Sequence, residues 1–146
     1  MMIIPLRTEC TKETHHMEAK IKHLEFIQET INRMASNSFL LKGWVVAVVG
    51  ALVTLSLKEI DCLYILTSLC VLFFFWLLDS YYLSREKAFR NLYDQVRKKA
   101  EGQIDFSMNI KECKGDNTVT DCAFSHTVLL FYGGLAVVHI IILIFL

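Results

Sequence analysis

The sequence predicts an all-α integral membrane protein with three transmembrane helices. Hydrophobic residues make up 54% of the 146 residues and are concentrated in three blocks, whereas the charged residues, 21% of the chain, fill the segments between the blocks. A soluble domain instead spreads its apolar residues at helix or strand periods, so this segregation is typical of a membrane protein. The only proline is Pro5, and no later residue therefore forbids long unbroken helices.

Residues 1–38 carry the pattern of an amphipathic helix before the first apolar block begins. Apolar residues recur at helical spacing and form one stripe, while charged residues occupy the other side. The stripe consists of Met17, Ile21, Leu24, Ile27, Ile31 and Met34. The charges make this helix too polar to span a bilayer, so we expect the stripe, through Leu24 and Ile31, to pack on a helix of the same chain or of a second copy. The short apolar start predicts no cleavable signal peptide.

The first two spans form a predicted transmembrane hairpin at residues 39–82. The first span covers about residues 39–57 and the second about residues 62–82, and the short turn between them requires antiparallel helices. A helix over the first span reaches about 28 Å, close to the roughly 30 Å of the apolar core of a bilayer. The polar run Ser-Asn-Ser at 36–38 favours helix N-caps, which predicts a break or kink just before the first span.

Residues 83–125 join the hairpin to the third span and are predicted to be cytoplasmic. The helical pattern of the second span continues without proline or glycine well past the apolar block, and Tyr82, Phe89 and Tyr93 fall on one side of it. We expect these three side chains to pack on the N-terminal helix. The polar loop that follows is predicted to hold a short strand or helical turn around residues 104–110.

The third span is predicted at residues 126–146, and the distribution of lysine and arginine sets the orientation of all three spans. Thirteen of these basic residues lie in segments 1–38 and 79–125, whereas one lies in the turn at 58–61. By the positive-inside rule, the N-terminus and the long second connection are expected in the cytoplasm. The turn and the C-terminus are expected on the outer side of the membrane.

Small residues in the predicted spans provide candidate helix-packing faces. Those in the first span recur about every four residues, so they share one side of the helix. The candidates are Gly43, Ala47, Gly50, Ala51, Gly133 and Gly134. Such a face lets a second helix approach closely, and it predicts either packing within the chain or self-association of copies. The sequence leaves both alternatives open.

Three ionisable residues fall inside the predicted spans or at their edges, where a charge is costly. Lys42 near the start of the first span and Asp79 near the end of the second are expected at the same cytoplasmic level. They are expected either to pair across the hairpin or to reach the lipid headgroups separately. His139 in the third span needs a hydrogen-bond partner from a neighbouring helix; in several copies it would instead line an aqueous path. The candidate partners are Thr54, Ser56, Thr67 and Ser68.

No enzyme motif is recognisable in the sequence, and we expect no catalytic activity. The chain holds no Gly-rich phosphate loop, nucleophile elbow or zinc-protease motif, and no cofactor or metal site is predicted. The formal net charge of zero argues against a nucleic-acid partner held by phosphate contacts. The five cysteines are an odd number at irregular spacing, which favours free thiols, although Cys113 and Cys122 flank a polar step that would allow them to meet.

Two stretches of the sequence resemble a known group of proteins. EFIQETINRMASNSFLLKGW at residues 25–44 and FFFWLLDSYYLSREKAFRNLYDQVR at residues 73–97 are similar to small prokaryotic multi-helix membrane proteins that resemble the SLATT-type anti-phage defence effectors. The resemblance covers about residues 20–100. It implies a location in the prokaryotic inner (plasma) membrane and an effector that assembles or opens once a sensor or partner detects infection. It brings no catalytic residues with it.

Two hypotheses for the function follow from these observations. The first is a homo-oligomeric membrane effector, pore-forming or membrane-disrupting, in anti-phage defence; its partners would be the lipid bilayer, further copies of the chain and a soluble signalling or sensor protein. The alternative is a membrane-anchored adaptor or structural subunit that recruits a soluble partner through residues 86–101 without conductance. The spans hold too few polar residues for a wide polar pore in one copy, so a pore would need several copies.

Overall fold

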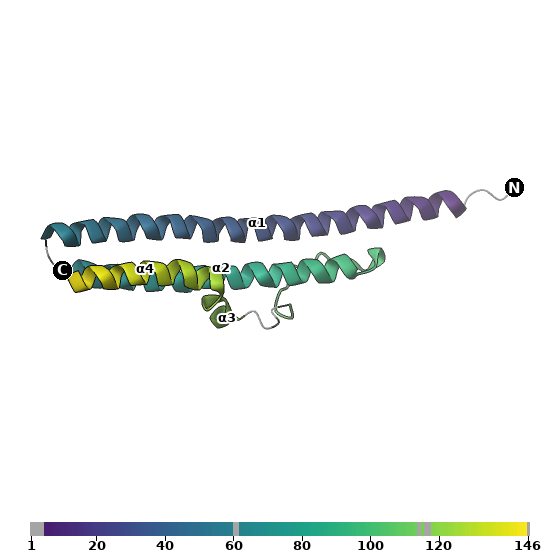
Figure 1. Cartoon of the computed structure of the whole chain (residues 1–146). Coiled ribbons are helices and arrows are strands. Elements are labelled where there is room, and N and C mark those ends of the chain that lie inside the picture. The colour runs from purple at the N-terminus through teal and green to yellow at the C-terminus, as the bar shows by residue number, and fades with distance from the viewer. Residues whose placement is uncertain (1–4, 60–61, 114, 116–117, 146) are drawn as a thin grey trace.

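The computed structural model is all-helical and elongated (Figure 1). It describes residues 5–59, 62–113, 115 and 118–145. The elements are α1 at Pro5–Glu59, α2 at Cys62–Lys98, the 3-10 turn η1 at Glu101–Gln103, α3 at Val119–Ala123 and α4 at His126–Phe145. Residues 60–61 of the predicted turn and residue 146 of the predicted third span lie outside the described residues.

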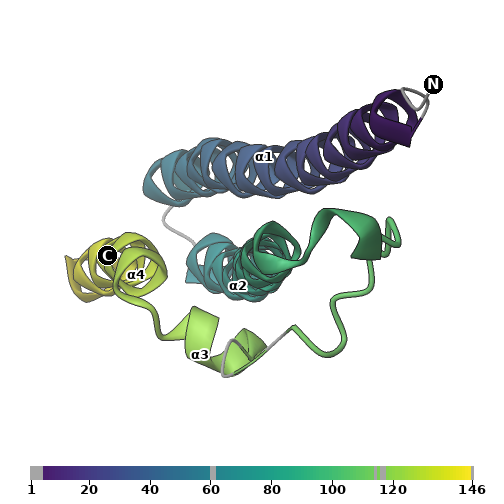
Figure 2. The same cartoon turned by 90° about the vertical axis from the view of Figure 1, so that its right-hand side faces the viewer.

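Helices α1 and α2 form an antiparallel hairpin, and α4 packs beside α2 (Figure 1). Viewed along the bundle, α1 and α4 lie on different sides of α2, and α3 covers part of α2 as well (Figure 2). The C-terminal end of α4 lies at the same end of the bundle as the end of α1 and the start of α2 (Figure 1). Helix α2 is therefore the central element, because it contacts each of the other three α-helices.

Three helices are long and apolar enough to cross a membrane, within Thr14–Lys58, Leu63–Lys98 and His126–Ile144. The structure thus confirms the prediction of an all-helical chain with three candidate spans, and the described residues include no strand. At most 28% of the residues in any of the three apolar windows are buried inside the chain. Most residues of each apolar window therefore lie on the surface of the chain.

Helix α1 runs without interruption through residues 36–38, where the sequence predicts a break (Figure 1). N-cap side chains stabilise a helix start only where the first backbone N–H groups have no partner. Ser38 has a different role, since it is buried and its hydroxyl bonds to Asp79 of α2. Packing on both sides of this point, at Ile31 and Val45, holds α1 as one helix. The predicted break is therefore wrong.

Two clusters of buried side chains hold the long helices together. One cluster lies in the apolar half of the bundle, which holds α1 after Lys42, α2 before Asp79 and α4. This cluster joins all three long helices and consists of Val45, Val49, Leu72, Val128 and Tyr132. The other cluster lies in the polar half, which holds α1 before Ser38 and α2 after Asp79, and it joins these two helices to the segment that follows η1. It consists of Ile27, Ile31, Leu92, Val96 and Cys113. The hairpin of α1 and α2 therefore has a core along both halves of its length.

The connection between α2 and α4 differs from the prediction. A strand or helical turn is predicted around residues 104–110, whereas helical structure falls on either side of that stretch, in η1 and α3. Helix α3 starts with a capping box: the Thr118 hydroxyl accepts from the backbone N–H of Asp121, and the Asp121 carboxylate accepts from the backbone N–H of Thr118. This Thr-x-x-Asp pattern is the sequence signal for α3.

Candidate functional site

A buried ion pair joins the two long helices between the two core clusters. The ammonium Nζ of Lys42 on α1 lies 2.6 Å from the carboxylate oxygen Oδ2 of Asp79 on α2. The Asp79 side chain is fully buried, whereas the Lys42 side chain is 27% exposed. The hydroxyl of Ser38 donates to the other carboxylate oxygen of Asp79 and accepts from Lys42 Nζ at 2.9 Å. Both charges therefore have hydrogen-bonded partners inside the bundle.

The third long helix contributes aromatic side chains to this ion pair. The ring centroid of Phe131 on α4 lies 6.0 Å from Lys42 Nζ, at the limit of a cation–π contact. The buried Tyr132 donates its hydroxyl to the backbone carbonyl of Phe75 at 3.3 Å and lies within electrostatic reach of the Asp79 carboxylate. Helices α1, α2 and α4 therefore meet at the ion pair.

The continuity of α1 places Ser38 and Lys42 side by side. Residues four apart lie on the same face of an α-helix, so the unbroken helix presents both side chains to Asp79. A break at 36–38 would separate the two side chains. The sequence leaves open whether Lys42 and Asp79 pair or reach the headgroups separately, and the structure pairs them.

The ion pair is suited to holding helices together rather than to chemistry. Both carboxylate oxygens of Asp79 accept bonds from side chains of α1, and the ammonium of Lys42 donates to two acceptors. Within the part of the chain that the structure describes, no group of three or more His, Cys, Asp or Glu residues is placed to hold a metal ion. The arrangement fixes the position of α1 against α2, because breaking a buried pair leaves an uncompensated charge.

The small-residue face of α1 is directed away from the rest of the chain. Gly43, Ala47, Gly50 and Ala51 are all exposed and lie about half a turn round the helix from the buried valines of α1. A Cβ atom built at Gly43 or Gly50 meets no other atom within 4 Å. No other helix of the described chain therefore packs closely on these four residues of α1.

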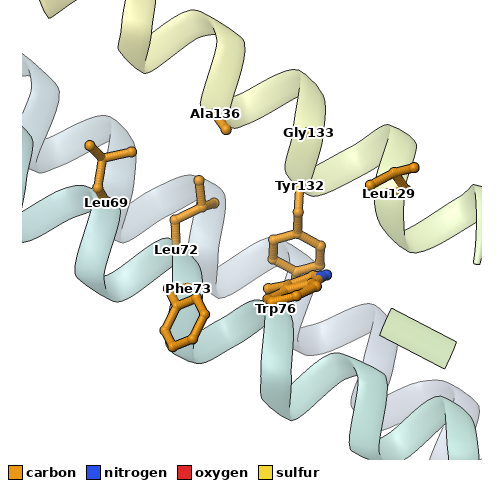
Figure 3. A pocket seen from close by; sticks show the side chains of 8 residues that line it. All are labelled: Leu69, Leu72, Phe73, Trp76, Leu129, Tyr132, Gly133 and Ala136. Carbon is orange, nitrogen blue, oxygen red and sulfur yellow. The ribbon is translucent and has the colours of Figure 1, made fainter. Parts of the chain in front are cut away.

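An apolar groove runs between α2 and α4 and has a volume of about 270 Å³ (Figure 3). Its lining residues are Leu69, Leu72, Phe73, Trp76, Leu129, Tyr132, Gly133 and Ala136. The indole N–H of Trp76 donates to the backbone carbonyl of Ala123 at 3.1 Å, which satisfies the polar atom of this ring. Gly134 is exposed, and a Cβ atom at Gly133 or Gly134 meets nothing within 4 Å. The sequence signal for the groove is the aromatic run at 73–76. Large side chains on α2 lie opposite small residues on α4, and together they form a concave surface.

His139 is buried in α4, but none of the predicted hydroxyl partners bonds to it. Its Nδ1 lies 2.7 Å from the backbone carbonyl of Leu135, one turn earlier on the same helix. Three of the four predicted partners donate to carbonyls of their own helices instead: Thr54 to Gly50, Thr67 to Leu63 and Ser68 to Ile65. The fourth, Ser56, has a buried hydroxyl without a partner in the described chain, as has Nε2 of His139. For Thr54, Thr67 and Ser68 the expected interhelical bond is absent because carbonyls of their own helices compete for the hydroxyls.

The predicted contact residues in the polar half of the hairpin lie mostly in one place. Four of them pack together in the cluster of that half: Leu24, Ile31, Phe89 and Tyr93. Tyr82 lies outside this cluster, and its ring contacts that of Tyr81 at 5.9 Å between centroids. Its position nearer the ion pair explains the difference, since the cluster begins further along α2.

A second buried histidine, His23 of α1, is missed by the sequence reading. Its Nε2 lies 3.1 Å from the backbone carbonyl oxygen of Ser107, and its ring centroid lies 5.3 Å from that of Phe106. Phe106 has φ +53°, a left-handed conformation that is unusual for an aromatic residue. The sequence signal is position, because His23 precedes Ile27 by one helical turn and therefore shares its buried face.

The three cysteines whose side chains the structure describes are free thiols. Cys70 is exposed, whereas Cys113 and Cys122 are buried and form no disulfide with each other. Burial raises the pKa of the Cys122 thiol, which disfavours its reactive thiolate form. The side chains of Cys10 and Cys62 lie outside the described residues.

Comparison with protein-family models, with curated proteins and with solved structures finds no match to this chain. The likeness to known effector proteins therefore rests on the two stretches of sequence quoted above. The packing of the helices, and the surfaces that they leave uncovered, are the ground for a functional assignment.

Proposed function

We propose that the chain is an integral membrane protein that assembles into homo-oligomers and acts as a membrane effector. Insertion is supported by α4, which contains no acidic, lysine or arginine residue and exposes large apolar side chains. Leu130 is 81% exposed and Ile144 is 73% exposed. Water around such a helix would be strongly unfavourable, whereas the apolar core of a bilayer covers it at no cost.

The proposed orientation places the polar half of the hairpin in the cytoplasm. Thirteen lysine and arginine residues lie in segments 1–38 and 79–125, whereas only Lys58, in the last turn of α1, lies at the opposite end of the first two spans. The positive-inside rule therefore favours a cytoplasmic N-terminus and an outer C-terminus. In this orientation the ion pair of Lys42 and Asp79 lies at the inner boundary of the bilayer, where the partly exposed ammonium of Lys42 reaches the headgroup region.

The observation that carries the proposal of self-association is the outward small-residue face of α1. Helices in a bilayer gain little from burying apolar surface, so their association depends on close approach and van der Waals packing. Gly43, Ala47, Gly50 and Ala51 allow that approach on a side of α1 that no other described helix covers. A second copy of α1 is the partner that fits this face.

A second observation supports self-association in the polar half of α1. Met17, Ile21 and Phe26 are 45%, 48% and 52% exposed, although the charged residues around them exclude this segment from a bilayer. The ammonium of Lys20 reaches the backbone carbonyl of Lys99 just beyond α2, so earlier residues of α1 extend past the end of α2 (Figure 1). Contacts between copies would remove these apolar side chains from water.

The effector role is proposed as conduction or disruption by the assembly rather than by one chain. The interior of a single chain is filled by the cluster of Val45, Val49, Leu72, Val128 and Tyr132. Any path for ions or water would therefore lie between copies, lined by apolar residues and gated by dewetting. The role in anti-phage defence is proposed on the resemblance of the sequence alone.

The mass of the detergent-extracted protein, measured by light scattering and corrected for bound detergent, tests self-association. We expect a defined oligomer of the unmodified chain and a lower mass for Ala47→Leu, because leucine blocks close approach at the small-residue face. Val48→Leu is the matched control, since Val48 is exposed and lies about 100° round the helix from Ala47. A monomer in the unmodified chain, or equal effects of the two substitutions, would contradict the proposal.

A membrane-anchored adaptor is the second candidate function, and a polar groove of the hairpin favours it. The groove lies between α1 and α2 in their polar half, has a volume of about 320 Å³ and is lined by Gln28, Ile31, Asn32, Ala35, Arg90, Tyr93 and Asp94. Its amide and charged side chains are solvent-exposed, and such groups would suit a soluble polypeptide partner. Planar-bilayer recording separates the two candidates, since the effector conducts or breaks the membrane and the adaptor does neither.

A further inference from the structure

Three polar side chains are buried in the apolar half of the bundle, one on each long helix. They are Ser56 of α1, Ser68 of α2 and His139 of α4, and none is more than 1% exposed. Polar side chains that face the interior of an apolar helix bundle are costly unless they are hydrogen-bonded. Each of these three side chains therefore needs a hydrogen-bond partner.

The register of the helices places the three side chains at one level. The ion pair of Lys42 and Asp79 aligns α1 with α2, and Ser56 lies as far along α1 from this pair as Ile65 lies along α2. Ser68 is less than one turn from Ile65. Residues on antiparallel helices that are equally distant from a shared contact lie side by side, so the hydroxyls of Ser56 and Ser68 occupy the same layer.

The same reasoning brings His139 of α4 into this layer. The hydroxyl of Tyr132 bonds to the backbone carbonyl of Phe75 and so aligns α4 with α2. His139 lies two helical turns beyond Tyr132, and Ser68 lies two turns before Phe75. The three buried polar side chains therefore form one layer across the bundle.

The hydrogen-bond roles of the three groups are complementary. Nδ1 of His139 lies 2.7 Å from the carbonyl oxygen of Leu135, so Nδ1 carries the hydrogen of the neutral ring and Nε2 is an acceptor. Neither Nε2 nor the hydroxyl of Ser56 has a partner in the described chain. The hydroxyl of Ser68 donates to the carbonyl of Ile65, which leaves its oxygen free to accept.

We propose that Ser56, Ser68 and His139 bind an internal water molecule between the three helices. This water accepts from the hydroxyl of Ser56 and donates to Nε2 of His139 and to the oxygen of Ser68. These three bonds satisfy every open role in the layer, and about three bonds are usual for a buried water. An apolar ligand would leave the hydroxyl of Ser56 and Nε2 of His139 without a partner, and a metal ion would lack the carboxylate or thiolate ligands that buried cation sites use.

Solid-state NMR of the full chain in lipid vesicles, with 15N-labelled histidine, tests the proposal. We expect His139 in the tautomer with hydrogen on Nδ1, together with polarisation transfer from an ordered water to its ring. The His139 signals are assigned by their loss in His139→Asn, and the exposed His126 provides a reference for contact with bulk water. A hydrogen on Nε2, or no transfer from water to His139, overturns the proposal.

Substitution of the serines shows whether they hold the water. Ser56→Ala removes the hydroxyl that donates to the water, so the transfer to His139 should fall at least several-fold while that to His126 is unchanged. Ser56→Thr keeps a hydroxyl and should retain the transfer. Thr54→Ala is the matched control, because the Thr54 hydroxyl is exposed and bonded to its own helix. Transfer that survives Ser56→Ala undiminished overturns the proposal, and the measurement on the unmodified chain stands even if a variant fails to fold.

Discussion

The charges of Lys42 and Asp79 differ in their access to solvent, and this asymmetry determines what each substitution should do. Asp79 is fully buried, whereas Lys42 is partly exposed and sits on a long flexible side chain. Removing Lys42 therefore leaves a buried carboxylate without its counter-charge. Removing Asp79 leaves an ammonium group that can turn toward water or headgroups. We expect Lys42→Met to destabilise the hairpin by about 3–5 kcal/mol, and Asp79→Leu to cost clearly less. Unfolding in mixed micelles with increasing denaturing detergent measures both.

Two further variants show whether the effect comes from the pair. Lys58→Met removes an exposed charge from the other end of the apolar segment of α1 and should change stability by less than about 0.5 kcal/mol. The double variant of Lys42→Met with Asp79→Leu should recover most of the loss, because no charge is then left unpaired. Additive losses in the double variant would mean that the two charges do not interact.

The capping box of α3 gives a prediction about pH. The hydrogen bond from the Thr118 hydroxyl is the main reason why the pKa of Asp121 lies below its ordinary value of 3.8. A lowered folded-state pKa means that the carboxylate stabilises α3 above the unfolded pKa and loses this effect as the pH falls through the folded pKa. Thr118→Ala should therefore raise the pKa of Asp121 toward 3.8. Carboxyl 13C shifts recorded between about pH 2 and 6 measure this change.

A control variant tests whether the loss of any nearby hydroxyl changes the pKa of Asp121. Thr127→Ala removes an exposed hydroxyl from the first turn of α4 without touching the capping box. The pKa of Asp121 should then stay where it is in the unmodified chain. An unchanged pKa in Thr118→Ala would show that the hydroxyl bond does not hold the carboxylate in its ionised form.

At the scale of single elements, α1 presents neighbouring residues to opposite environments. Ile27 is fully buried against α2, whereas Phe26 is 52% exposed. Ile27→Ala should destabilise the polar half of the hairpin by about 2–5 kcal/mol, because it leaves a cavity in the cluster with Leu92 and Val96. Hydrogen exchange at the amides of residues 88–98 measures the free energy of opening of this half.

Phe26→Ala is the control within the same turn of helix. The Phe26 side chain is more than half exposed and does not belong to the cluster of Ile27, Leu92 and Val96, so hydrogen exchange in residues 88–98 should stay nearly unchanged. If copies cover Phe26, the same variant should lower the mass of the assembly instead. Equal effects of the two substitutions on exchange would contradict the packing of the polar half.

The elements that the sequence predicts correctly are those with a strong period. Three long apolar segments and the amphipathic stripe through Leu24 and Ile31 follow from hydrophobic spacing, which does not depend on distant contacts. A local capping rule predicts the break at 36–38. Tertiary packing overrides this rule, because the Ser38 hydroxyl bonds to Asp79. Helix α3 was missed because five residues are too few to show a period.

The arrangement of the three long helices determines which surfaces face outward and which side chains pair, and no single helix determines either. Small residues permit close packing on any partner, so only the arrangement of three helices reveals that the face with Gly43 and Gly50 is directed outward. The pairing of Lys42 with Asp79 was one of two alternatives in the sequence, and the register of the hairpin decides between them. For His139 the sequence indicates the need for a partner, but the competition between helix carbonyls and interhelical hydroxyls depends on orientations that spacing does not define.

The length of α1 is the property of the whole molecule that is most directly measurable. An unbroken helix rises about 1.5 Å per residue, so spin labels at Glu25 and Leu55 should lie about 45 Å apart in a narrow distribution. Both positions are exposed, and they flank the predicted break. Double electron–electron resonance in vesicles measures this distance. Excess unlabelled chain dilutes the labels, so that distances between labels on different copies do not contribute.

A second label pair separates a break at 36–38 from general disorder of the helix. Leu40 and Leu57 are exposed and lie on the same side of the predicted break, and their labels should stay about 25 Å apart in either case. A kink would shorten and broaden only the distance between Glu25 and Leu55. Such a kink would also carry Ser38 away from Lys42 and Asp79, and would break the two hydrogen bonds of the Ser38 hydroxyl. A single long distance, by contrast, means that one rigid helix links the polar half of the hairpin to the apolar half, and that movements of one half are transmitted to the other.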